Sequence, residues 1–241
     1  MRIRRVKWSK KKKNQTYRGL TVGEFRFGVI FDNWHILVAG LGVTLQVTFV
    51  SLLCGMVLGI ILGMMRLSSN RILATIALAY VAVLRNTPAL IQLIWVYYCL
   101  PLLIGFDLEA TTSCIVALSL HAGGYVGEIV RGGIQSIDQG QVEAARTIGL
   151  SRWQTMYKVI LPQALRRMIP PLVNEGISLL KYSSLVSVLG VADLTYQAQV
   201  LSTTTFRPLE VFTFLGIEYF VLCSVASYGA HILELRLARR S

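Results

Sequence analysis

Residues Ile36 to Met65 read ILVAGLGVTLQVTFVSLLCGMVLGIILGMM and contain no charged side chain. An α-helix rises about 1.5 Å per residue and needs about 20 apolar residues to cross a hydrocarbon layer of roughly 30 Å. The stretch is long enough for such a crossing. It is also too long, and begins too late, for the apolar part of a cleaved signal peptide, so we expect the mature protein to keep its N-terminus.

Four further apolar blocks follow, each close to the length of one membrane crossing. They lie within residues 72–104, 111–130, 159–191 and 211–233. The sequence therefore predicts an all-α fold, a polytopic membrane bundle of five transmembrane helices.

The composition excludes most soluble proteins. Hydrophobic residues make up 54% of the 241 positions and charged residues only 15%, with a mean hydropathy of +0.58, whereas an ordinary soluble domain carries roughly 25% charged residues. Residues 1–34 hold ten Lys or Arg against two acidic residues. Because this basic charge forms one terminal run beside apolar segments, it points to a lipid surface and not to nucleic acid. We separate a basic tail, residues 1–34, from a transmembrane domain, residues 35–241.

Glycine spacing in the first and third blocks favours tight helix packing. Gly55, Gly59 and Gly63 follow one another at intervals of four residues, as do Gly123 and Gly127. Small residues at this spacing share a helix face and allow two backbones to approach closely.

Prolines interrupt the second and fourth blocks. Pro88 follows Arg85-Asn86-Thr87 in the second block, and the fourth block contains Pro162, Pro170 and Pro171. Proline removes a helix hydrogen bond, and freed backbone groups survive in a membrane only where protein or water covers them. We therefore expect both helices to be bent or discontinuous, with the prolines disturbing the first half of the fourth block, and to line a pathway.

The longest hydrophilic stretch separates the third and fourth blocks. It contains two pairs typical of capping boxes, namely Asp138 with Gln141 and Ser151 with Gln154. Gly149 lies between them, where a left-handed C-cap fits. Residues 138–158 are therefore expected to form two short helices on the membrane surface.

Basic residues alternate between the loops. They gather in the segment holding Arg66 and Arg71, in the hydrophilic stretch and at the C-terminus, while the other loops carry at most one. The positive-inside rule then places these three segments in the cytoplasm and residues 101–110 and 192–208 outside. Five crossings also place the N-terminus outside, where its ten basic residues conflict with the rule.

Motifs for chemistry on this chain are missing from the sequence. No phosphate-binding loop, zinc-protease or nucleophile-elbow motif occurs, and the four cysteines and three histidines show no ligand spacing. We expect no cofactor on this chain and no metal, so any energy from ATP has to come from a partner.

Several ordered motifs resemble ABC-importer permeases. Glu143-Ala144-Ala145, Gly149 and Leu161-Pro162 resemble the EAA loop of that family, with Val159 in place of its usual Ile. Arg85-Asn86-Thr87-Pro88 followed by Gln92 is similar to a segment of the polar amino acid subfamily, the histidine and glutamine permease type, with Asn86 in place of the commoner Gly. Further matches are Tyr125-x-x-Glu128-x-x-Arg131-Gly132-Gly133-Ile134 and Lys181-x-Ser183-Ser184-Leu185.

The resemblance covers about residue 40 to the C-terminus and implies a type I, MetI-like permease with a cytoplasmic coupling helix. Such a chain sits in the bacterial cytoplasmic (inner) membrane as a multi-pass, non-enzymatic subunit that imports polar amino acids. The implied partners are a second permease subunit (same or paralogous), two ATP-binding cassette ATPase subunits that bind ATP and Mg, an extracytoplasmic solute-binding protein and membrane lipid.

The resemblance also implies which residues couple the chain to its ATPase: Glu143, Ala144, Ala145, Gly149, Leu161 and Pro162. Spacing alone fits an ordinary amphipathic surface helix equally well. Two small alanines would let the helix sit deep in a partner's groove, while Glu143 would accept hydrogen bonds from that partner.

Polar residues embedded in the apolar blocks are candidates for a substrate pathway, because polar groups in a membrane usually face an interior or a water path. The candidates are Arg85, Asn86, Gln92, Glu128, Asn174 and Lys181. Two plainer roles stay open: Glu128 can pair with Arg131 three residues on, and Arg85 can extend to the membrane interface. Separated donors and acceptors suit an amino acid but do not select its side chain.

Two other functional classes remain as alternatives. A subunit of a secondary transporter would run on an ion gradient alone and would need no ATPase. An integral-membrane enzyme would need a catalytic constellation, which the sequence does not contain.

Overall fold

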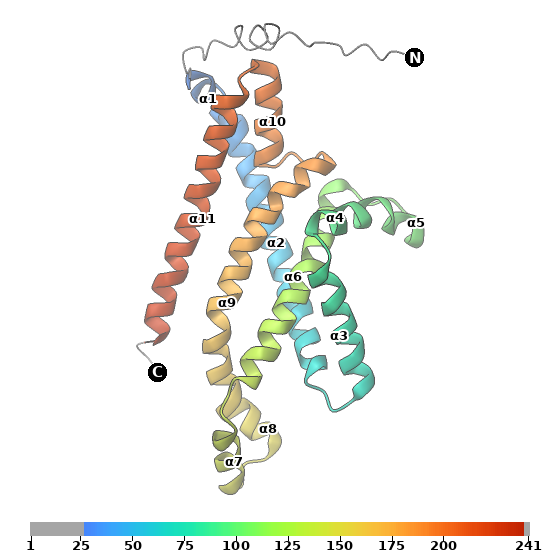
Figure 1. The fold of residues 1–241 in the computed structure, drawn as a ribbon, viewed down its shortest axis with the longest axis vertical. Coiled ribbons are helices and arrows are strands. Elements are labelled where there is room, and N and C mark those ends of the chain that lie inside the picture. The colour runs from blue at the N-terminus through green and yellow to red at the C-terminus, as the bar shows by residue number, and fades with distance from the viewer. Residues whose placement is uncertain (1–26, 239–241) are drawn as a thin grey trace, which may run out of the picture.

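The computed structural model describes residues 27–238, and the elements assigned within that range are all helical (Figure 1). The first half contains α1 (Gly28–Asp32), α2 (Trp34–Arg66), α3 (Arg71–Asn86), α4 (Ala89–Tyr98), α5 (Leu100–Ile104) and α6 (Ala110–Gln135). The second half contains α7 (Gln139–Thr147), α8 (Arg152–Thr155), the π-helix η1 (Met156–Ile160), α9 (Leu161–Tyr182), the 3₁₀ helix η2 (Ser183–Leu189), α10 (Leu194–Thr205) and α11 (Pro208–Ala238).

Three helices, α2, α6 and α11, are each long and apolar enough to cross a membrane. Two bent pairs pass the same test together: α3 with α4–α5, bent by 108°, and the helical run from α8 to η2 with α10, bent by 50°. Counting each bent pair as one crossing gives the five crossings that the sequence predicts.

The prolines act differently in the two bent crossings. The second block breaks between α3 and α4, at Thr87–Pro88, as predicted. The fourth crossing is bent, as predicted, but α9 runs through Pro170 and Pro171 without a break, so the disturbance predicted at these two prolines does not occur. A proline removes only one donor, and membrane helices tolerate this loss.

The irregular turns of the fourth block lie on either side of α9. The π-turn of η1 directly precedes Pro162 and bonds the Leu161 amide to the Met156 carbonyl. The 3₁₀ turns of η2 end at Gly190, which has a positive φ of 78°. The bend toward α10 follows there and not at the prolines.

The interface between α2 and α6 is the most extensive in the bundle, and glycines make it possible. A Cβ atom added at Gly59 would lie 2.4 Å from Val126 Cβ, and one at Gly55 would lie 2.5 Å from Ala122 Cβ. A side chain does not fit at such distances, so the backbone of α2 packs directly against the small side chains and backbone of α6. This confirms the close packing predicted from the glycine spacing.

The main hydrophobic core joins α2, α4, α6, α9 and η2. A second cluster joins α1, α2, α10 and α11, with Ile30 of α1 buried in it. Residues 28–32 of the predicted tail are therefore part of the folded structure, while residues 1–26 lie outside the described residues. A third cluster lies between α6 and α9. A partly buried hydrogen bond also joins two helices: the Tyr80 hydroxyl of α3 donates to the Leu120 carbonyl of α6 at 2.9 Å.

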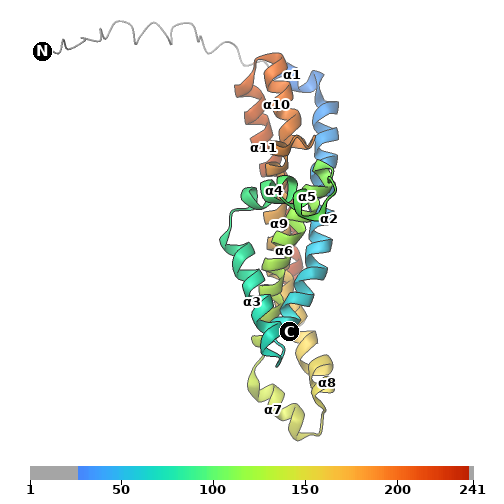
Figure 2. The ribbon, with the colours of Figure 1, turned by 90° about the vertical axis from the view of Figure 1, so that its right-hand side faces the viewer.

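The loops gather at two ends of the bundle. The α7–α8 segment, the α2–α3 turn and the C-terminal end of α11 lie toward one end, and α1 and the α10–α11 turn lie at the other (Figure 1). The pair α4–α5 lies across the bundle and not along it (Figure 2). The two ends agree with the alternation of basic loops along the sequence.

Candidate functional site

The α7–α8 segment forms a rigid elbow, defined here as residues 138–158. Asp138 caps α7 by accepting from the Gly140 amide at 2.8 Å. The predicted capping box with Gln141 does not form, because the Gln141 side chain instead accepts a hydrogen bond from Gln163 Nε2 of α9 at 2.6 Å. The elbow is thereby joined to the long helix that follows it.

The turn between the two elbow helices needs glycine. Gly149 has a φ of +85°, in the left-handed region that glycine adopts without steric cost. Its amide bonds to the Arg146 carbonyl at 2.9 Å, and the Leu150 amide bonds to the Ala145 carbonyl at 3.1 Å. This pair of bonds is the Schellman arrangement and confirms the left-handed C-cap predicted from the sequence. The capping box at Ser151 is complete as well.

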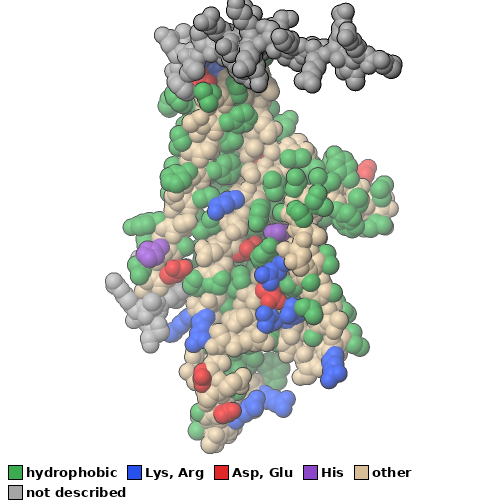
Figure 3. Space-filling view, viewed as in Figure 1, with side chains coloured by type: hydrophobic (Ala, Val, Ile, Leu, Met, Phe, Trp, Pro, Cys, Tyr) green, Lys and Arg blue, Asp and Glu red, His purple; other side chains and the backbone are tan. Residues whose placement is uncertain are grey.

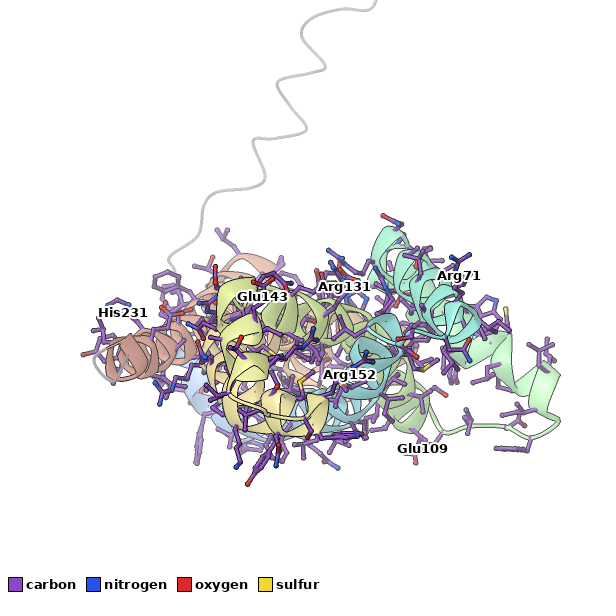
Figure 4. All side chains as sticks on the ribbon, turned by 90° about the horizontal axis from the view of Figure 1, so that it is seen from below. Arg71, Glu109, Arg131, Glu143, Arg152 and His231 are labelled. Carbon is purple, nitrogen blue, oxygen red and sulfur yellow. The ribbon has the colours of Figure 1, made fainter. Side chains whose placement is uncertain are left out.

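The six predicted coupling residues divide by exposure. Glu143, Ala144, Gly149, Leu161 and Pro162 are exposed. Ala145 is buried, at 4% exposure, inside the chain itself, so within this chain it does not offer a surface to a partner. Figure 4 shows Glu143 and Arg152 on the elbow, in the view from that end.

A row of polar side chains follows one face of α6. His121, Tyr125, Glu128 and Arg131 are spaced by four, three and three residues, which places them along a single helix face. Glu128 accepts from Arg66 of α2 at 2.7 Å and from Arg131 at 2.7 Å. The Arg131 pairing is the plainer role that the sequence left open, and the contact with Arg66 adds a tie to another helix.

Arg85, at the C-terminal end of α3, completes what we call the arginine cluster: Arg66, Arg85, Glu128 and Arg131. Its guanidinium lies 3.9 Å from Glu128 Oε2 and 5.2 Å from the centre of the Tyr125 ring. Four charged groups from three helices therefore meet within an otherwise apolar bundle. Arg66, Arg85 and Glu128 line one pocket, and Asn86 lies in the wall of that pocket as well.

The other end of the row is built on His121. Its Nδ1 lies 3.1 Å from Gln92 Oε1, and its ring contacts the rings of Tyr125 and Tyr182 with centroids 4.9 and 5.0 Å apart. The Nε2 atom is buried and has no partner within the described residues. Such a side chain joins α4, α6 and α9 at one point.

The Gln92 side chain supplies a hydrogen bond that the backbone lacks where the second crossing breaks. In a continuous helix the carbonyl of Leu84 would accept from residue 88, which is proline and has no amide hydrogen. Gln92 Nε2 donates to that carbonyl at 2.7 Å and also contacts Thr87 Oγ1 at 2.8 Å. The polar atoms of Gln92 are therefore already engaged inside the protein.

The fourth crossing presents polar groups of two kinds. Asn174 and Lys181 are exposed, seven residues apart on α9. Glu175 is buried, and its Oε1 has no hydrogen-bond partner within the described residues. Lys181 lies in the wall of a pocket of about 810 Å³ together with Ser224, Ser227 and His231 of α11.

Sequence reasoning missed part of this polar interior. It placed Arg66 in a loop, assigned no chemistry to His121 and gave no role to Tyr182. The spacing of His121, Tyr125 and Glu128 on one helix face was the available signal. The contact of Arg66 with Glu128, 62 residues along the chain, left no local pattern to find.

Residues 55–239 match the family of binding-protein-dependent transport system inner membrane components. The chain belongs to this family. The glutamine transport system permease protein GlnP of Escherichia coli (strain K12) is 36% identical over 215 residues, which are 89% of this chain and 98% of GlnP. The arginine transport system permease protein ArtQ of Bacillus subtilis (strain 168) is 38% identical, over 88% of this chain and 96% of ArtQ.

Solved structures agree with the fold of this permease. A chain of an amino acid ABC transporter crystallised with histidines is 36% identical, with a TM-score of 0.84 over 88% of this chain and 99% of that chain. The MetNI methionine ABC transporter shares 23% identity with a TM-score of 0.72, over 84% and 96% of the two chains. The MetI-like permease fold expected from the sequence motifs is confirmed.

Proposed function

We propose that this chain is the transmembrane permease subunit of an ATP-driven importer for polar amino acids. The observation that carries the proposal is the polar row on α6, which runs through an apolar bundle toward a rigid and exposed elbow. A solute needs such a row to cross, and a partner ATPase needs such an elbow to act on. The naming of the relatives as glutamine and arginine permeases supports the choice of solute class.

The substrate pathway in this proposal includes Arg85, Asn86, Gln92, Glu128, Asn174 and Lys181. The α6 row adds His121 and Tyr125 to that set. A zwitterionic solute needs donors for its carboxylate and acceptors for its ammonium, and this set of residues contains both kinds. Gln92 contributes by holding the broken helix in shape.

A second permease subunit, the same chain or a paralogue, completes the pathway. Lys181 is exposed at the side of α9, and a charge at the centre of a bilayer costs about 2.5–3.5 kcal/mol on insertion scales. In Figure 3, charged side chains gather near the middle of the molecule, whereas hydrophobic ones gather over α11 and over α4–α5. A second subunit over these charged side chains would keep lipid away from them.

Energy enters through the elbow. Two ATP-binding cassette subunits carry ATP and Mg and contact Glu143, Ala144, Gly149, Leu161 and Pro162, while Ala145 holds the elbow together from inside. An extracytoplasmic solute-binding protein delivers the substrate at the opposite end. We assign the transmembrane domain to residues 35–241 in the bacterial cytoplasmic membrane, and we keep residues 1–34 as a separate basic tail, of which residues 28–32 pack against that domain.

Reconstitution tests this function directly. The chain is co-purified with its ATPase, placed in liposomes and supplied with the solute-binding protein, and uptake of radiolabelled glutamine, arginine and histidine is measured. We expect uptake of at least one of them that depends on ATP. Uptake driven by an ion gradient without ATP would point to a secondary transporter, and no uptake of any polar amino acid would contradict the proposal.

The same assay tests the elbow with Gly149→Val. A β-branched side chain at a φ of +85° costs roughly 1–2 kcal/mol, so we expect the turn to open and uptake to fall to background while the protein stays in the membrane. Gly229→Val on α11, where an added Cβ meets nothing within 4 Å, serves as control. Normal uptake and ATPase binding by the Gly149 variant would remove the elbow from the coupling path.

A further inference from the structure

Three members of the arginine cluster, Arg66, Arg85 and Glu128, line a pocket with more positive than negative charge. The pocket has a volume of about 360 Å³ and lies between α3, α6 and the C-terminal end of α2. Its polar wall holds Arg66, Arg85, Asn86, Tyr125 and Glu128, and its apolar wall is the side of α3 with Leu78, Val81 and Ala82. Two guanidinium groups thus face one carboxylate in the wall, and Arg131 adds a third behind it.

The single carboxylate is already fully used. Glu128 Oε1 accepts from Arg66, and Oε2 accepts from both Nε and Nη2 of Arg131. Arg85 remains 3.9 Å from Oε2, beyond hydrogen-bond distance, and makes no hydrogen bond to another described residue. Its planar fork of donors is therefore open toward the pocket.

Arg85 is nevertheless held in place. Its guanidinium lies over the Tyr125 ring at 5.2 Å, and it extends from the last turn of α3, where the helix dipole favours a cation. A guanidinium fixed in this way loses little freedom when it binds a planar anion through two parallel hydrogen bonds. Because the pocket wall holds two guanidinium groups and one carboxylate, a second anionic group would balance its charge.

Two anions reach such a site in a membrane, a solute carboxylate and a lipid phosphate. The cluster includes Arg85 and Glu128, which the proposed function assigns to the pathway, and side chains of both charges gather near the middle of the molecule in Figure 3. The apolar wall from Val81 and Ala82 suits the aliphatic part of a small solute. Both observations favour the solute.

We infer that this pocket binds the carboxylate of the transported amino acid, with Arg85 as the donor that contacts it. The inference rests on the proposed function and adds to it the site at which the carboxylate is recognised. Glu128, Arg66 and Arg131 then act as positioning residues: Arg66 and Arg131 occupy the Glu128 carboxylate, so Arg85 is left without a hydrogen-bonded carboxylate in a cluster that carries more positive than negative charge.

Binding to the permease–ATPase complex without the solute-binding protein provides the test. The Kd is measured for a transported amino acid and for the amine that lacks its carboxylate. We expect Arg85→Gln to weaken binding of the amino acid about tenfold or more, the loss of a charge-assisted pair, and to leave the Kd of the amine unchanged. Arg85→Lys should restore part of the affinity.

Arg71→Gln is the matched control, because Arg71 is exposed at the opposite end of the same helix (Figure 4). An unchanged Kd for the amino acid in Arg85→Gln, or an equal change for acid and amine, would overturn the inference. So would an effect that appears only when phosphatidylglycerol is added to phosphatidylcholine liposomes, since lipid phosphate would then be the ligand. Failure of the proposed function would show separately, as wild-type protein without ATP-driven uptake.

Discussion

A missing hydrogen at Pro88 leaves the Leu84 carbonyl without its helical donor, and the Gln92 side chain fills that gap. The same amide group reaches Thr87 with its nitrogen and His121 with its oxygen. One residue therefore fixes the ends of α3 and α4 and links both to the polar row of α6. A glutamine is needed here because it donates and accepts within one planar group.

Replacement of Gln92 by leucine should accordingly weaken the fold. An apolar side chain leaves the Leu84 carbonyl unpaired next to the break, a loss of about 1–3 kcal/mol. We expect Gln92→Leu to lower the midpoint of thermal denaturation in detergent and to reduce uptake. Gln199→Leu, at an exposed position of α10, should leave that midpoint unchanged. A Gln92→Leu protein as stable as the wild type would show that Gln92 only lines the route.

Some of these residues could be predicted and others could not, for a physical reason. Gln92 and Glu128 can be recognised in the sequence because a polar side chain in an apolar block costs free energy of insertion and is usually kept for a functional or structural role. Arg66 does not stand out, since an arginine at the end of an apolar block is typical of a cytoplasmic loop. Only the folded bundle brings its guanidinium to Glu128.

At the scale of the elements, the packing of α2 against α6 depends on glycines, which carry no side chain. Gly55, Gly59 and Gly63 lie along one face of α2 against Ala122, Val126 and Val130 of α6. Lipid tails are as apolar as leucine, so close van der Waals packing and not the hydrophobic effect holds such helices together. The interface therefore loses stability wherever a side chain separates the backbones.

Leucine at Gly59 tests this interface, because the added Cβ alone would lie 2.4 Å from Val126. We expect Gly59→Leu to abolish stable expression of the complex. Gly42→Leu, on the same helix at a site where an added Cβ meets nothing within 4 Å, should express normally. Size-exclusion profiles of the two purified variants give the comparison, and equal profiles would contradict the packing argument.

The sequence predicted where the helices lie better than it predicted where they bend. Apolar length alone located the five crossings, and turn chemistry at Gly149 and Ser151 located the elbow. The bend of the fourth crossing could not be located, because Pro170 and Pro171 look like a break in the sequence but lie in a continuous helix. The actual irregular turns depend on how α9 meets its neighbours.

Across the whole molecule, basic charge and geometry define the same two ends. The elbow and the turn with Arg66 and Arg71 lie toward one end, and α1 lies at the other (Figure 1). Positively charged loops stay in the cytoplasm during insertion, so the elbow end is predicted to be cytoplasmic. The ten basic residues of the N-terminal tail then lie outside, against the same rule.

Cysteine labelling in intact cells decides between the orientation favoured by the basic loops and the orientation favoured by the basic N-terminal tail. Ser69, in the turn after α2, and Thr203, near the end of α10, are both exposed and lie at opposite ends of the bundle. In a background without the four native cysteines, we expect an impermeant thiol reagent to label Thr203→Cys and to spare Ser69→Cys until the cells are opened. The three basic segments outweigh one tail because they flank crossings directly, where charge acts on orientation. The reverse pattern, with Ser69→Cys labelled and Thr203→Cys protected, would place the elbow outside, away from any ATPase, and would overturn the coupling role along with the orientation.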